Sequence, residues 1–119
     1  MVAGFSKKMR LLTAADFKRV FDAPDQRSVD HLFTLLVRKN DLGYSRLGMA
    51  ITKKRLKRAV DRNRTKRIIR ETFRSQQNKL VGVDVVVMNR NALAGAENIE
   101  LFQSLAKHWP RLVKRCKKS

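Results

Sequence analysis

The first group of regularly spaced apolar residues along the chain predicts a short helix. Phe17, Val20 and Phe21 recur at spacings of three and four residues, which places them on one helical face. Residues 13–16 ahead of them have the form of a capping box, with a threonine at the first position and an aspartate at the last. Residues 23–25 contain a proline and end the predicted helix.

Alternating positions then predict strands over residues 26–30, 33–38 and 46–52, the first of them a short edge strand. Residues 40–43 carry turn-forming side chains, so we expect the second and third strands to pair as a hairpin. One face of this pair is bulky and apolar and is predicted to be core: Phe33, Leu35, Val37, Leu47, Met49 and Ile51. The other face is small and partly polar: Thr34, Leu36, Arg38, Gly48, Ala50 and Thr52. Two interpretations of this second face stay open, an uncovered surface or the floor of a cleft.

The second half of the chain predicts a long helix over residues 58–78 and a strand over 83–89. The strand is dense in valine, as expected for a central strand that is buried on both faces. Residues 91–98 are predicted to form a loop. The succession of elements predicts an α+β sandwich in which helices pack on a small sheet.

A last helix is predicted to follow, and its buried face is expected to carry Ile99, Phe102, Ala106 and Trp109. Pro110 is expected to kink or restart this helix, because proline lacks the backbone N–H of a helix interior. The whole of residues 1–119 is predicted to form a single domain, with a basic arm over residues 1–10 and a basic tail over residues 114–119.

Composition adds a strong electrostatic constraint to this picture. The chain has 28 Lys and Arg against 10 Asp and Glu, a formal net charge of +18. That balance favours a nucleic acid as partner, and an anionic membrane only second. No apolar run is long enough for a membrane span or a secretory signal, and Cys116 is the single cysteine, so we expect a cytoplasmic protein without disulfides.

The charge is concentrated on the long predicted helix. Residues 53–79 hold 12 Lys or Arg against Asp61 and Glu71 alone. Helical phasing places Asn63 and five cations on one side, next to the apolar arc that docks on the sheet: the cations are Arg62, Lys66, Arg67, Arg70 and Arg74. Guanidinium groups grip phosphates in a bidentate manner, so this side is predicted to dock on a phosphate backbone. The less favoured alternative is a charged face that is merely solvated.

The aromatic pair and the ionisable residues allow narrower predictions. Phe17 and Phe21 are most simply core residues, and the alternative is a platform on which unpaired bases stack. The acidic residues are scattered, so the chain offers no carboxylate cluster for a two-metal nuclease. His31 and His108 lack a paired nucleophile or ligand spacing, which predicts ordinary surface or core histidines.

Several stretches together closely resemble the protein subunit of bacterial ribonuclease P. Residues 51–54 and 59–71 contain the family's Arg-Asn-Arg motif at 62–64, with its trailing basic residues. The segment 17–21 is similar to the family's FxxVF helix, and Arg46-Leu47-Gly48 to the start of its third strand. The resemblance covers about residues 8–115.

The resemblance implies an α-β-β-β-α-β-α fold with a left-handed crossover around the basic helix, where the general rule is right-handed. It implies a protein that does no chemistry itself. The partner would be ribonuclease P RNA, with one protein bound to each RNA. This RNA would cleave the 5′ leader from precursor tRNA, and it would hold most of the Mg²⁺ ions that the reaction uses.

The resemblance also implies roles for single residues. The RNA-binding set is Arg62, Asn63, Arg64, Lys66, Arg67, Arg70, Lys53 and Lys54. The set that lines a cleft for the leader is Phe17, Phe21, Leu36 and Thr52, and Leu36 stands where many relatives carry an aromatic residue. The alternative function is a general RNA-binding or ribosomal-type protein without a role in tRNA processing, and a cationic membrane-surface protein ranks third.

Overall fold

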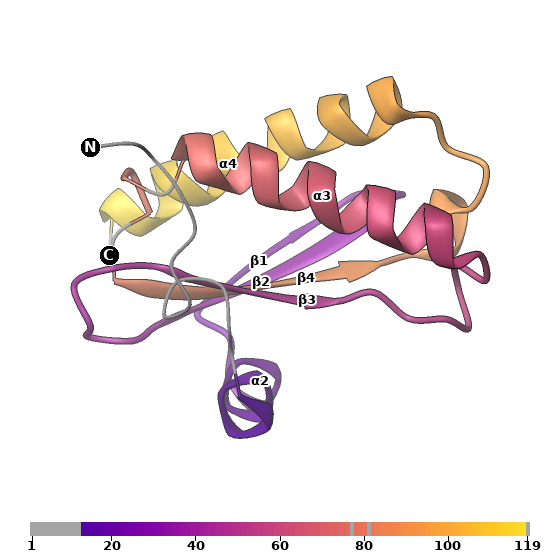
Figure 1. The fold of residues 1–119 in the computed structure, drawn as a ribbon. Helices are drawn as coiled ribbons and strands as arrows, with labels where there is room; N and C mark the ends of the chain where they lie inside the picture. The colour runs from indigo at the N-terminus through magenta and orange to yellow at the C-terminus, as the bar shows by residue number, and fades with distance from the viewer. Residues whose placement is uncertain (1–12, 77, 81, 119) are drawn as a thin grey trace.

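The computed structural model describes residues 13–76, 78–80 and 82–118, and shows a four-stranded sheet with helices on both faces (Figure 1). Two long helices, α3 and α4, lie side by side on one face, and the short helix α2 lies on the other. The elements in chain order are α2 (Ala14–Asp22), β1 (Gln26–Val29), β2 (Phe33–Lys39), β3 (Arg46–Ala50), α3 (Ala59–Gln76), β4 (Val83–Asn89), the 3-10 turn η1 (Asn91–Leu93) and α4 (Asn98–Lys118). The predicted α+β class is confirmed, and the predicted arm over residues 1–10 lies outside the described residues.

The sheet order is β1-β2-β4-β3, so the predicted hairpin between β2 and β3 is wrong. β4 lies between them, antiparallel to β2 and parallel to β3. The turn that follows β2 reverses the chain but does not require the two flanking strands to pair. β4 is buried on both faces over residues 83–87, so it gains more than β3 from the central position.

The connection from β3 through α3 to β4 is a left-handed crossover. In Figure 1 both strands run in the same direction, α3 lies above them, and β3 is nearer to the viewer than β4. Most such connections are right-handed, since the twist of the strands favours that hand. The hand expected from the family resemblance is therefore the one in the structure.

The main core lies between the sheet and the pair α3 and α4. The predicted core face of β2 and β3 is confirmed, because its residues are buried or pack against the buried cluster. Phe73 of α3 and Trp109 of α4 join the two helices, with ring centroids 5.5 Å apart. The indole Nε1 of Trp109 donates a hydrogen bond to Thr72 Oγ1 at 2.9 Å, which satisfies its polar atom inside the core.

The buried face predicted for α4 is wrong, except at Trp109. Ile99 is 58% exposed, Phe102 is 38% exposed, and Ala106 also faces outward. The stripe that packs on the sheet is instead Leu101, Ser104, Leu105, His108, Trp109 and Leu112. The apolar residues of this helix fit two stripes about 100° apart, and the predicted stripe was the one that lacks the leucines.

α4 also runs through Pro110 and reaches Lys118 as one helix. Pro110 is exposed and so lies on the outer side of the helix. Because proline has no backbone N–H, one carbonyl of the preceding turn has no helical donor, and on this side it can accept a hydrogen bond from water instead. The predicted restart at Pro110 is wrong, and residues 114–118 are the end of a helix rather than a tail.

A polar cluster fastens β1 to α4. Arg111 Nη1 donates to Ser28 Oγ at 3.0 Å, and Ser28 Oγ lies 2.6 Å from Nδ1 of the buried His108. The Ser28 hydroxyl can therefore donate to Nδ1, which places the proton of a neutral imidazole on Nε2, 3.2 Å from Asp30 Oδ2. Burial lowers the pKa of His108, against the opposing effect of the Asp30 charge.

The carboxylate of Asp30 has an unusual environment. Burial alone would raise its pKa, but hydrogen bonds from the Ser104 hydroxyl and from the backbone N–H groups of Phe33 and Leu32 lower it to about 2. A lowered pKa stabilises the fold above the usual value near 3.8, and this contribution is lost as the pH falls from about 4 towards 2.

We expect the Asp30→Asn variant to be less stable than the parent at pH 7, and we expect its free energy of unfolding to vary less with pH. Between about pH 5 and 2 the parent should lose roughly 1 to 2 kcal/mol that the variant does not lose, after allowance for partial exposure. Urea unfolding at a series of pH values measures this difference. Asp22→Asn, at an exposed site, is the control and should retain the slope of the parent. Identical slopes for Asp30→Asn and the parent would contradict the prediction.

Candidate nucleic-acid interface

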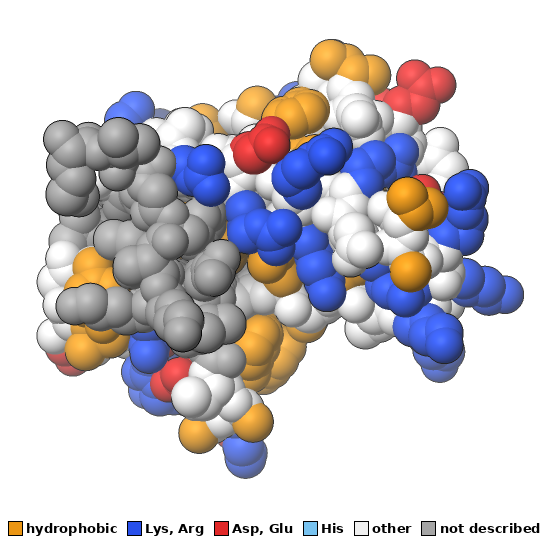
Figure 2. All heavy atoms as spheres, viewed as in Figure 1, with side chains coloured by type: hydrophobic (Ala, Val, Ile, Leu, Met, Phe, Trp, Pro, Cys, Tyr) orange, Lys and Arg blue, Asp and Glu red, His pale blue; other side chains and the backbone are white. Residues whose placement is uncertain are grey.

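The basic surface of the chain is built on α3. Thr65, Ile68, Ile69 and Phe73 are buried against the sheet, which confirms the predicted docking arc. The opposite side carries the cations, and Figure 2 shows Lys and Arg side chains gathered over α3 and the loop that leads into it. The helix therefore presents its charge to solvent on a rigid support.

Two arginines of the motif also hold the local structure. Arg62 Nη1 donates to the backbone carbonyls of Leu56 and Lys57, at 2.9 and 2.7 Å, and so fixes the loop before α3. Arg64 Nη2 donates to the carbonyl of Ala96 at 3.3 Å and ties α3 to the segment before α4. Sequence reasoning treated both as free ligands for RNA and did not detect these backbone contacts.

The other predicted cations are more open. Arg67 is exposed and its Nε is 4.0 Å from Glu71 Oε1, a loose pair in solvent. Lys66 and Arg70 are partly exposed and form no ion pair within the part of the chain that the structure describes. The remaining predicted RNA-binding residues, Asn63, Lys53 and Lys54, are exposed. These side chains can exchange water for phosphate oxygens at low cost.

The second face of the sheet is covered in part by α2. Val20 of α2 is fully buried against Leu36 and Val86, and Phe17 packs on the edge of this small cluster. The rings of Phe17 and Phe21 are stacked with centroids 6.2 Å apart, and Phe21 is 42% exposed. Phe17 thus supports the packing, as the core interpretation expects, whereas Phe21 is exposed and the stacking interpretation for it stays a prediction.

The other two residues of the predicted leader cleft differ in exposure. Leu36 is 3% exposed and lies within the cluster under α2. Thr52 is exposed just beyond β3, and its backbone N–H donates to Asn89 Oδ1 at 3.0 Å. Phe17 and Leu36 are therefore brought into one cluster, while Phe21 and Thr52 provide exposed surface.

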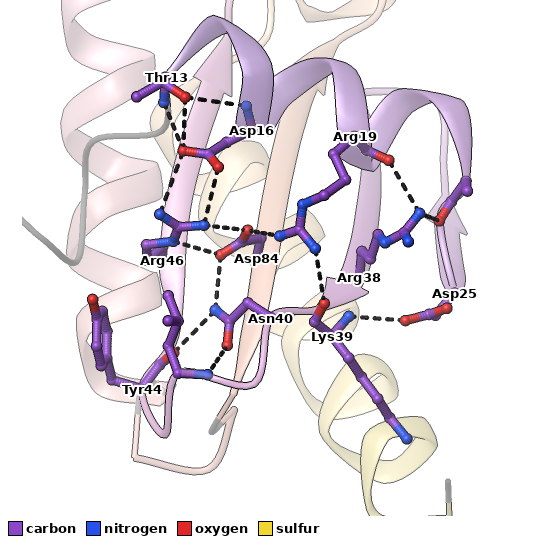
Figure 3. Close-up of polar contacts among 12 residues, drawn as sticks. Thr13, Asp16, Arg19, Asp25, Arg38, Lys39, Asn40, Tyr44, Arg46 and Asp84 are labelled. Atoms are coloured by element: carbon purple, nitrogen blue, oxygen red, sulfur yellow. Dashed lines mark hydrogen bonds and ion pairs between the residues drawn. The ribbon is translucent and has the colours of Figure 1, made fainter.

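A buried carboxylate fixes α2 to the sheet (Figure 3). Asp84 of β4 is 0% exposed, and its two oxygens accept four hydrogen bonds. Arg46 of β3 donates two of them, from Nε at 2.8 Å and Nη2 at 2.7 Å. Arg19 of α2 donates the third at 2.6 Å, and Asn40 Nδ2 donates the fourth at 2.8 Å.

Arg46 extends this network to the first turn of α2. Its Nη2 lies 3.3 Å from Asp16 Oδ1, and Asp16 forms the predicted capping box with Thr13. The backbone hydrogen bond from Thr13 lowers the pKa of Asp16, and Arg46 adds to that effect. The hydrogen bonds of Asp84 raise the pKa of Arg46 above its already high value. Helix α2 is thus held at both its first and its middle turn.

Sequence reasoning missed this network, because Asp84 was taken for one scattered acid among several. The signal was present in the pattern of β4. An aspartate inside a strand that is otherwise apolar and central must be buried, and a buried carboxylate requires cationic partners.

The two histidines lie in different surroundings. His31 is exposed, and His108 is buried in the cluster between β1 and α4, as a surface and a core histidine respectively. Among residues 13–76, 78–80 and 82–118, no three His, Cys, Asp or Glu side chains lie close enough to hold a metal ion. No helix in the same ranges is both long and apolar enough to cross a bilayer.

Comparison with known proteins gives a consistent result. Residues 5–113 match the family model described as Ribonuclease P. The chain is 47% identical to the ribonuclease P protein component of Histophilus somni over 98% of this chain and 97% of that protein. It is 46% identical to the ribonuclease P protein component of Pseudomonas syringae pv. tomato, over 96% and 86% respectively.

Solved structures are similar over most of the chain as well. The RNase P protein from Thermotoga maritima superposes with a TM-score of 0.74 at 31% identity, covering 86% of this chain and 96% of that one. The RNase P protein of Staphylococcus aureus gives a TM-score of 0.78 at 27% identity, covering 88% and 94%.

Proposed function

Because this chain belongs to the ribonuclease P protein family and is a protein subunit of that tRNA-processing ribonuclease, we propose a division of its surface between two RNAs. The basic side of α3 binds ribonuclease P RNA, and the side of the sheet that carries α2 binds the 5′ leader of precursor tRNA. The observation that carries this proposal is the cationic side of α3, packed rigidly on the sheet.

The α3 surface suits a structured RNA. Its open cations Lys66, Arg67 and Arg70 stand at helical spacing on a support that does not have to be ordered upon binding. Each cation that meets a phosphate releases a condensed counterion, so the surface favours a polyanion with closely spaced charges. Arg62 and Arg64 add rigidity through their backbone contacts.

The α2 side suits a single strand. The exposed ring of Phe21, stacked on Phe17, offers an apolar face to an unpaired base. Stacking tolerates any base, so this surface does not require a particular leader sequence.

We further propose that the RNA subunit carries the chemistry and binds the Mg²⁺ that it needs, with one protein per RNA, in the cytoplasm. Among the described residues no three acidic, His or Cys side chains converge to hold a metal ion by themselves, so a Mg²⁺ ion beside this protein would take most of its ligands from RNA phosphates and water. The protein's part is binding and orientation of the two RNAs.

Reconstitution with ribonuclease P RNA tests this function. Cleavage of precursor tRNA at low Mg²⁺ should require both the protein and the RNA, and RNA alone should recover activity at high Mg²⁺. Cleavage by the protein without RNA would refute the assignment of the chemistry. Equal affinity for mature and precursor tRNA would refute the leader site and favour a general RNA-binding protein.

The Phe21→Ala variant should weaken binding of precursor tRNA by the holoenzyme by about tenfold, because base stacking on an aromatic ring contributes about 1 to 3 kcal/mol. The loss should be present with long leaders and absent with mature tRNA. Binding assays over a series of leader lengths measure it. Phe102→Ala is the matched control, since Phe102 is 38% exposed against 42% for Phe21 and lies in the other layer. An equal loss in the two variants would argue against the leader site.

A further inference from the structure

A groove lies between the starts of α3 and α4. One wall is the loop of residues 54–58 with the first turns of α3, and the other is the segment 94–99 that leads into α4. Its cationic side chains are Lys54, Arg55, Lys57, Arg58 and Arg64, against two carboxylates, Asp61 and Glu97. The groove is therefore positively charged.

Two helix N-termini add to this charge. α3 begins at Ala59 and α4 at Asn98, and residues beside both starts line the groove. Each N-terminus carries a partial positive charge from its free N–H groups. The carboxylate of Asp61, in the first turn of α3, offsets part of this positive charge. It also lies 3.7 Å from Arg58 and 3.8 Å from Arg64 and so partly neutralises these two cations. The balance still favours an anion.

Arg64 lacks an acceptor for one of its donors. Its Nη2 bonds the carbonyl of Ala96, but its Nε is buried without a hydrogen-bond partner among the described residues. The Nε itself is closed off from solvent, so a phosphate in the groove would meet the exposed part of the Arg64 side chain, which is 29% exposed. The wall of the groove thus presents a partly exposed guanidinium charge to an incoming phosphate.

The groove is also apolar, which a site for phosphate alone does not need. Leu56 and Ala96 are buried beneath it, and Ile99 stands at its edge with 58% of its surface exposed. Gly95 has a φ of +89°, and a Cβ placed there would meet no atom within 4 Å, so open space adjoins the segment. An exposed isoleucine beside open space and cations suits a flat, apolar group that carries a phosphate.

We propose that this groove receives one unpaired nucleotide of an RNA strand, with its base against Ile99 and its phosphate towards Arg64 and the lysines of the 54–58 loop. The inference rests on the proposed function and adds a nucleotide-sized site to the α3 surface. It differs from the leader site, because no residue of α2 lines the groove.

The test is a titration of the full, ¹⁵N-labelled chain with AMP, ribose 5-phosphate and inorganic phosphate at constant ionic strength. We expect the amide signals of Gly95, Ala96 and Asn98 to shift with all three ligands. AMP should bind about three- to tenfold more tightly than ribose 5-phosphate, because only AMP buries a base on the apolar wall.

Two variants separate the apolar part from the charged part. Ile99→Ser should remove the advantage of AMP and leave phosphate binding unchanged, whereas the control Phe102→Ser, exposed on the same helix outside the groove, should behave as the parent. Arg64→Met should weaken all three ligands. With ribonuclease P RNA, Ile99→Ser should weaken binding more than Phe102→Ser does.

Equal affinity for AMP and inorganic phosphate would overturn the proposal and leave a simple anion site. Shifts confined to α2 and the second face of the sheet would overturn it as well. The titration needs no RNA subunit, so its failure is distinct from failure of the proposed function, which the cleavage assay measures.

Discussion

Asp84→Ala is expected to destabilise the protein by about 3 to 5 kcal/mol, because it removes the central acceptor of a buried ion-pair network, leaving Arg46 with only its longer contact to Asp16 and Arg19 without a carboxylate. Arg46 is only 16% exposed and cannot recover its hydrogen bonds from water, while Arg19 at 36% exposed recovers some. Urea unfolding followed by circular dichroism gives the free energy directly. The loss should be large enough to unfold part of the population at 37 °C.

The control for this change is Asp22→Ala, which removes an exposed pair with Lys18 and should alter stability by less than about 0.5 kcal/mol. The double variant Asp84→Val with Arg46→Met should be more stable than the sum of its single changes predicts, since the two side chains act as a pair. Strict additivity, or a loss at Asp84 no larger than at Asp22, would show that the network does not hold the fold.

The milder change Asp84→Asn tests whether Asp84 keeps α2 in place on the sheet. The amide keeps the shape but loses the charge that holds Arg19 of α2, so α2 should be held less firmly on the sheet. Binding of long-leader precursor tRNA should weaken in this variant while the affinity for ribonuclease P RNA stays near that of the parent. A change in RNA-subunit affinity of the same size would assign the effect to general unfolding.

The second large effect is expected for the double variant Arg67→Ala, Arg70→Ala. Removal of two phosphate contacts should reduce the affinity for ribonuclease P RNA by about 10- to 100-fold near 0.1 M salt. The slope of log affinity against log salt should fall by roughly two. Filter binding at four or five salt concentrations measures both quantities.

The matched control removes the same charge from the other end of the helical layer. Lys79 and Lys114 line a groove with Gln76 and Pro110, and their double substitution by alanine also lowers the net charge by two. A purely non-specific attraction would give the two double variants the same affinity for ribonuclease P RNA and the same salt slope. Specific docking on α3 requires a clearly smaller slope for the Arg67 and Arg70 variant alone.

The parts of the fold that the sequence predicted well are those with a strong local signal. The capping box at Thr13, the alternation in β2 and β3 and the docking arc of α3 each depend on neighbours in the sequence, and each is confirmed. The errors concern partners that are distant along the chain. The register of α4 was ambiguous because two apolar stripes fit it, and only contact with the sheet selects between them.

The candidate site shows the same division. The cations of α3 were evident from composition and phase, but the backbone bonds of Arg62 and Arg64 reach loops that no local pattern identifies. The role of Asp84 depends on Arg19 and Arg46, which lie 65 and 38 residues away along the chain. Such contacts become visible only when the order of the strands is known.

The central place of β4 has a consequence for the synthesis of the chain. β4 pairs with β2 along its whole length and with β3 over residues 84–88, and it lies near residue 85 of 119. A nascent chain that ends before Val83 has no strand between β2 and β3, so the sheet cannot close. Until β4 has been synthesised, the first two thirds of the chain, which carry the dense cations of α3, therefore lack a folded core. Folding of this protein should therefore be a late and cooperative event, dominated by contacts between distant segments.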